Sequence, residues 1–123
     1  MNQSQVFDAI RELLPQVTKE AIISWADFIA DMNFGDPQGK LRMCRELYAE
    51  ILLIQQNYGN ELATSLFNMG ERYPLNTFEL SGAAEKMDSG KTEKDIYEEI
   101  SSFGWHPPKE YTHQVQLIIQ GLG

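Results

Sequence analysis

The chain has 123 residues, a formal net charge of −8 at pH 7 and a single cysteine. This length predicts one domain with its own hydrophobic core, and one cysteine excludes an internal disulfide framework. The acidic balance disfavours direct binding to nucleic acid or to an anionic membrane, because both require clustered lysine and arginine. It favours a partner with a basic surface, although an acidic surface also promotes solubility.

The lack of a membrane-length apolar run and of a signal-peptide pattern predicts a cytoplasmic protein. No linker is long enough to divide the chain, so residues 1–123 are expected to form one helical domain. Residues 1–40 carry three basic and six acidic side chains, and residues 76–104 carry three and seven, so neither segment is basic. No apolar run approaches the ~18 residues of a membrane-spanning helix. The first residues, Met1 to Ser4, have neither the basic nor the apolar region of a signal peptide.

Two helices are predicted before residue 35. In the first, apolar residues between Val6 and Leu14 recur at helical spacing, and Pro15 ends the helix. The second runs from about residue 17 or 18 to Met32, and its polar side carries Asp27 and Asp31. The segment Asn33-Phe34-Gly35 then closes this helix.

The longest predicted helix covers residues 37–58, and the rest of the chain is expected to pack around it. Asp36 is suited to cap it, Pro37 to occupy its first position, and Gly59 to end it. Four successive large apolar residues, 51–54, point about 100° apart on a helix, so several of its faces must be covered.

The C-terminal half continues the helical pattern. A helix after Asn60 stops at Tyr73-Pro74, and residues 75–104 form a helical hairpin that opens with a capping box at Asn76 and Glu79. Residues 109–120 suit a helix or a strand, and we predict a helix because no second strand is available for pairing. The predicted fold class is therefore all-α, a single-domain bundle of six or seven short helices around residues 37–58.

Three segments resemble known functional motifs but lack a feature that each motif requires. Ser89-Gly90-Lys91-Thr92 ends like a phosphate-binding loop, but Glu85 stands where that motif needs a glycine. The hairpin between Leu80 and Phe103 has the length of a helix-turn-helix, but its second helix is acidic and would repel DNA. Glu110-Tyr111-Thr112-His113 has metal-ligand spacing but occurs once, whereas di-metal bundles need the motif twice.

No catalytic, metal or cofactor residues are assigned, and we expect a protein that is not an enzyme. Cys44 is expected to be buried on the central helix rather than to act as a nucleophile or a ligand. The two histidines do not combine with a nucleophile in any recognisable pattern. Carboxylate pairs occur at Asp27 and Asp31 and at Glu46 and Glu50, and we expect both pairs on exposed helix faces.

The candidate binding residues are acidic and aromatic side chains in the C-terminal half. The acidic ones would present a phosphate-like array to a basic groove, unless they only form a solvated helix face. The aromatic ones are typical of interface residues, although the tryptophan between a glycine and two prolines would equally suit a lid on its own core. The predicted partner-binding residues are Glu85, Asp88, Glu93, Asp95, Glu98, Glu99, Trp105 and Tyr111.

The favoured function is non-enzymatic: an acidic protein that binds another protein, as an inhibitor occupying a basic, nucleic-acid-binding surface. In size, acidity and lack of catalytic motifs the chain resembles small inhibitors and accessory proteins of phages and mobile elements, including anti-CRISPR and immunity proteins. One alternative is a structural or assembly protein, a homo-oligomer that hides Trp25 or Phe28. A second alternative is a small carboxylate-dependent hydrolase, which requires the carboxylates to converge.

Overall fold

The computed structural model describes residues 1–122, which fold into seven α-helices and one 3-10 helix, η1. The elements are α1 (Gln3–Leu13), α2 (Lys19–Met32), α3 (Pro37–Tyr58), α4 (Asn60–Met69), η1 (Thr77–Glu79), α5 (Leu80–Asp88), α6 (Glu93–Phe103) and α7 (Lys109–Gly121). These residues contain no strand, which confirms the predicted all-α class, and the ambiguous segment 109–120 lies in helix α7.

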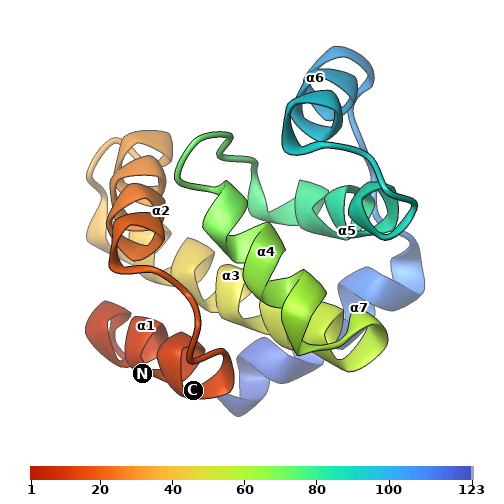
Figure 1. Cartoon of the computed structure of the whole chain (residues 1–123). Coiled ribbons are helices and arrows are strands. Elements are labelled where there is room, and N and C mark those ends of the chain that lie inside the picture. Colours follow the sequence, from red (N-terminus) through yellow and green to blue (C-terminus); the bar gives the residue numbers. More distant parts are fainter. Residues whose placement is uncertain (123) are drawn as a thin grey trace.

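Helix α3 is the centre of the fold, with the bounds that its capping residues predict. The carboxylate of Asp36 accepts a hydrogen bond from the Gly39 N–H at 2.9 Å, Pro37 opens the first turn, and Gly59 follows the last turn with φ 95°. Every other helix except α6 packs against α3, which runs through the middle of the molecule (Figure 1). Ile51 and Ile54 are buried, as expected for a helix covered on several sides.

Trp25 fixes α2 to the rest of the core. Its side chain is 1% exposed, and its indole N–H donates to the Phe67 carbonyl oxygen at 2.9 Å. Gly70 lies so close to this ring that a Cβ there would collide with the indole Nε1. Phe28 is half-buried against the same core. The chain therefore covers Trp25 itself, and a second copy is not needed to hide it.

The C-terminal helices form the predicted hairpin and then return along α3. Helices α5 and α6 pack together, and α7 lies on α3. The N-terminal ammonium of Met1 donates to the Leu122 carbonyl oxygen at 3.2 Å, which agrees with the adjacent ends in Figure 1. Within residues 1–122, no helix combines the length and the apolar character required to cross a membrane.

Candidate functional site

Ion pairs neutralise half of the acidic residues that were predicted to bind a partner. The pairs are Arg72–Glu93 (2.9 Å), Lys86–Glu99 (3.3 Å), Lys91–Glu99 (3.1 Å) and Lys94–Glu98 (4.0 Å). Within the described residues, Glu85, Asp88 and Asp95 form none. The two lysines beside Glu99 hold the pKa of its carboxyl below the ordinary value. The face of α6 therefore carries alternating charges rather than a continuous acidic array.

The two aromatic residues of the predicted site are turned toward their own chain. Trp105 lies on Gly82 of α5, where a Cβ would come within 2.5 Å of the indole Cδ2. Its indole N–H donates to the Ser81 hydroxyl at 3.0 Å. Tyr111 is half-buried, and its hydroxyl donates to a carboxylate oxygen of Glu50 at 3.4 Å. Trp105 thus has the contacts of a lid on α5, which was the alternative to an interface residue in the sequence analysis.

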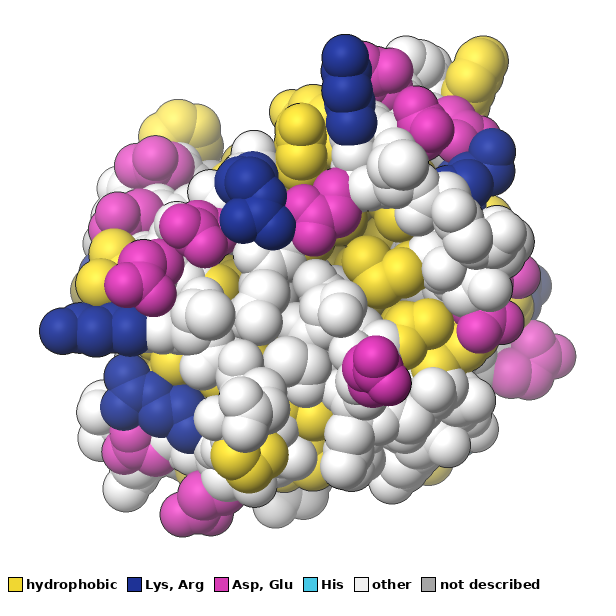
Figure 2. Space-filling view, viewed as in Figure 1, with side chains coloured by type: hydrophobic (Ala, Val, Ile, Leu, Met, Phe, Trp, Pro, Cys, Tyr) yellow, Lys and Arg dark blue, Asp and Glu magenta, His cyan; other side chains and the backbone are white. Residues whose placement is uncertain are grey.

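A second acidic surface lies on α2, which we define as Glu20, Ile23, Asp27, Asp31 and Phe34. All five side chains are exposed, which confirms the expectation for the pair Asp27 and Asp31. No ion pair among residues 1–122 involves their carboxylates. Acidic side chains gather over α2 in Figure 2, whereas basic and acidic side chains are interspersed over α6. This α2 surface was absent from the predicted binding residues.

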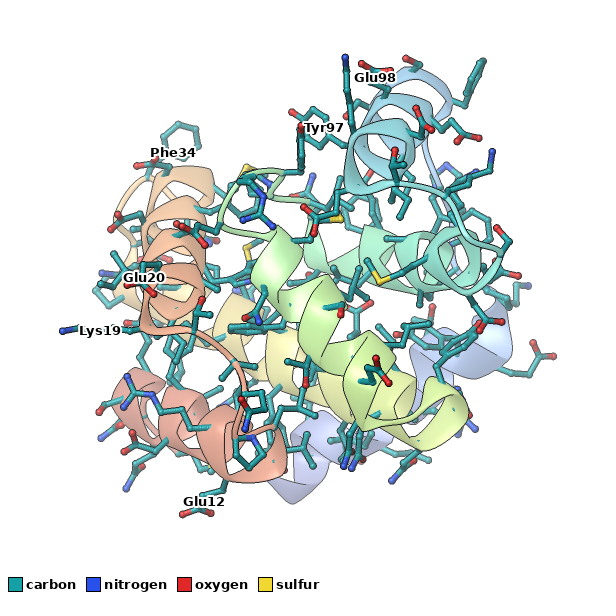
Figure 3. The ribbon with its side chains drawn as sticks, viewed as in Figure 1. Glu12, Lys19, Glu20, Phe34, Tyr97 and Glu98 are labelled. Carbon is teal, nitrogen blue, oxygen red and sulfur yellow. The ribbon has the colours of Figure 1, made fainter. Side chains whose placement is uncertain are left out.

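Phe34 stands at the end of the α2 surface in an unusual backbone conformation. It is 98% exposed, and its φ of 51° is positive, a region that a bulky residue adopts at a cost of about 1–3 kcal/mol. The turn is held by hydrogen bonds from the Gly35 N–H to the Ala30 carbonyl (3.0 Å) and from the Asn33 side-chain amide to the Ile29 carbonyl (2.7 Å). Phe34 consequently projects away from the body of the molecule (Figure 3).

A buried carboxyl group lies at the junction of α3, η1 and α7. Glu50 is 3% exposed, so the expectation of an exposed face is wrong for this residue, because α7 covers this side of α3. Glu46, one turn earlier, is half-buried and accepts a hydrogen bond from the Thr77 hydroxyl at 3.0 Å. Both line a pocket of about 230 Å³, the Glu50 pocket, formed by Glu46, Glu50, Thr77, Phe78, Pro107, Tyr111, Thr112, Val115 and Gln116.

Burial changes the acidity of the groups in and near this pocket. It raises the pKa of the Glu50 carboxyl well above its ordinary value, and the neighbouring Glu46 carboxylate raises it further. The hydrogen bond from Tyr111 acts in the opposite direction. Burial and the adjacent Glu50 raise the pKa of the Tyr111 hydroxyl. Glu50 is therefore biased toward the neutral acid in the free protein.

Cys44 has the environment of a core residue. It is fully buried on α3, and burial raises the pKa of its thiol to about 11. Since the thiolate is the reactive form, this cysteine is a poor nucleophile, and its expected burial is confirmed. Within residues 1–122, no group of three or more histidine, cysteine, aspartate or glutamate side chains is arranged to hold a metal ion.

The chain matches no protein-family model, no curated protein and no solved structure.

Proposed function

We propose that this is a non-enzymatic acidic protein that binds a partner protein through its α2 surface. The observation that carries the proposal is the combination of three unpaired carboxylates with a phenylalanine that is 98% exposed. The α2 surface thus offers carboxylates that form no ion pair within the described chain. Beside them is an aromatic side chain whose burial against a partner would be favourable.

The chemistry of the α2 surface favours one kind of partner. Glu20, Asp27 and Asp31 call for lysine or arginine on the facing surface, and Phe34 calls for an apolar recess at its edge. The positive φ of Phe34 supports this proposal, because strained backbone positions cluster at binding and other functional sites. A basic surface of this kind is typical of nucleic-acid-binding proteins, so occupying it would inhibit them.

The acidic residues of α5 and α6 remain a competing prediction for the binding surface. Helix α6 provides matched controls, since it also ends in an exposed phenylalanine: Phe103 is 87% exposed. Asp95 and Glu98 correspond to Asp27 and Asp31 as exposed carboxylates on one helix. Equivalent substitutions on the two helices therefore separate a specific interface from the general effect of net charge.

The experiment is a quantitative affinity capture with four variants, followed by affinity measurement on each captured protein after purification. Charge reversal by D27K/D31K should weaken binding at least about tenfold at low salt, and F34A about 30-fold, the loss for an interface hot spot. The controls D95K/E98K and F103A should bind as the unmodified protein does. Raising the salt concentration should weaken binding of the unmodified protein and leave D27K/D31K less affected.

The controls make the proposal easy to overturn. Equal capture by the D27K/D31K variant and by the unmodified protein would eliminate the α2 surface as the binding site. Loss of binding in D95K/E98K alone would assign the interface to α6 instead. Light scattering of the purified protein tests the structural alternative, because a homo-oligomer that F34A converts to a monomer would show that Phe34 packs against a second copy.

A further inference from the structure

The Glu50 pocket combines negative charge, hydroxyl groups and aromatic rings in a small volume. Its carboxyl groups come from Glu46 and Glu50, its hydroxyl groups include that of Thr77, and its rings come from Tyr111 and Phe78. Its volume of about 230 Å³ suits a short aliphatic chain with a polar head.

Glu50 is placed in this pocket without the partners that a buried carboxylate requires. No lysine, arginine or histidine of residues 1–122 forms an ion pair with Glu50 or Glu46. The Tyr111 hydroxyl reaches only Oε1, at 3.4 Å, which is long for a hydrogen bond between oxygen atoms. The other oxygen, Oε2, accepts no hydrogen bond from the described chain and keeps a small solvent-accessible area, whereas the residue as a whole is only 3% exposed. A charged Glu50 therefore lacks a counter-ion.

We propose that the Glu50 pocket binds a primary alkylammonium group, with Glu50 and Glu46 as its counter-ions. An ammonium group has three N–H donors, which match the free Oε2 of Glu50, the carboxylate of Glu46 and a hydroxyl oxygen at the pocket wall. The rings of Tyr111 and Phe78 favour a cation near their faces, and Val115 provides an apolar wall for the alkyl chain. This site is separate from the α2 surface and does not depend on the proposed partner binding.

Binding of a cation at this position should release a proton. The free protein favours the protonated acid at Glu50, and an ammonium group beside it favours the carboxylate. The titratable groups that line the pocket beside Glu50 are Glu46 on α3 and Tyr111 on α7. Glu50 is the carboxyl biased toward its protonated form, so it is the group expected to lose the proton. The affinity for amines should therefore rise as the pH increases from the ordinary glutamate pKa toward the raised one.

The test is isothermal titration calorimetry of the full chain with n-butylamine and diaminobutane, with n-butanol as the neutral analogue. The amines should bind with release of about one proton, measured in two buffers of different ionisation enthalpy, and n-butanol should not bind. A lysine-containing tripeptide with blocked ends forms a second arm. Tighter binding of the tripeptide would identify the ligand as a lysine side chain, and tighter binding of diaminobutane a free amine.

Variants connect the binding to Glu50. E50Q keeps the shape of the side chain and should weaken amine binding about 10- to 100-fold, the effect of losing a charge-assisted hydrogen bond, and should abolish proton release. Y111F removes only the hydroxyl that contacts Glu50 and leaves the carboxyl group in place, so it should weaken amine binding less. The control E110Q, at an exposed glutamate next to Tyr111, and D27K/D31K on the α2 surface should bind amines normally. Failure of the unmodified protein to bind either amine or the tripeptide at millimolar concentration would overturn the proposal.

The pH dependence of stability provides a second test of Glu50, and it requires no ligand. Because folding raises the pKa of Glu50, its stabilising contribution is complete below the ordinary value of 4.5 and is lost as the pH rises toward the raised value. The stability of the unmodified protein should decline across that range, and E50Q should show a shallower decline. Equal declines would show that Glu50 is already ionised in the free protein, which contradicts the predicted proton release.

Discussion

Helices α2 and α6 carry similar exposed residues but differ in what surrounds them. Both present several carboxylates to solvent, and both end in an exposed phenylalanine, Phe34 or Phe103. Three of the four carboxylates of α6 meet cations, which come from the turn after α4, from α5, from α6 itself and from the segment between α5 and α6. The carboxylates of the α2 surface meet none within the described chain. The number of acidic residues in a segment is therefore a poor guide to where uncompensated charge lies.

The largest expected effect concerns the C-terminal side of this comparison, where the connector after α6 packs on α5. Gly82→Ala places a methyl group against the ring of Trp105, where a Cβ would come within 2.5 Å. Such overpacking should lower the free energy of unfolding by about 1–3 kcal/mol and shift the fluorescence of Trp105 toward that of an exposed indole. Chemical unfolding and emission spectra measure both effects.

A matched control is available in the same helix. Ser81→Ala removes the hydroxyl that accepts from the Trp105 indole but adds no atom, so it should leave the ring in place with a smaller loss. If Gly82→Ala left both stability and fluorescence unchanged, Trp105 would be free to leave α5. It would then be available to a partner, as the sequence had suggested.

A smaller effect is expected at the tip of the α2 surface. Phe34→Gly removes the side chain at a positive φ, so it should raise the free energy of unfolding by up to about 1 kcal/mol while weakening partner binding. The control Phe103→Gly, inside the last turn of α6, should instead destabilise the protein, because glycine is unfavourable in a helix. A loss of stability in Phe34→Gly would refute the inference that Phe34 is strained.

The sequence predicted what local chemistry determines and missed what packing between distant segments determines. The bounds of α3 follow from Asp36, Pro37 and Gly59, which act within a turn of the helix ends. The pairing of Glu93 with Arg72 depends on how α6 meets the turn after α4, and no local pattern encodes that distance.

Two residues show where local reasoning could have gone further. Glu50 directly precedes the apolar run 51–54, and the requirement that several faces of this helix be covered already implied that a neighbouring carboxylate could be buried. For Phe34 local reasoning reached only the neighbouring residue: Gly35 was the natural residue for a positive φ, but in the structure both Phe34 and Gly35 have a positive φ. The α2 surface could be recognised only after the paired carboxylates had been distinguished from the unpaired ones.

The smallest expected effect tests the ion pairs that distinguish the two helices. Arg72→Ala removes the cation that joins the turn after α4 to Glu93 of α6 through contacts at 2.9 and 3.1 Å, and it should cause a small loss of stability that high salt abolishes. Arg11→Ala, which breaks a single pair within α1 at 3.9 Å, is the control and should lose less. Urea unfolding at low and high salt compares the two variants.

If neither variant lost stability at low salt, the ion pairs of α6 would be no more favourable than the interaction of the same side chains with water. The carboxylates of α6 would then be as available to a basic partner as those of α2, and only the phenylalanine and charge-reversal variants would distinguish the two surfaces.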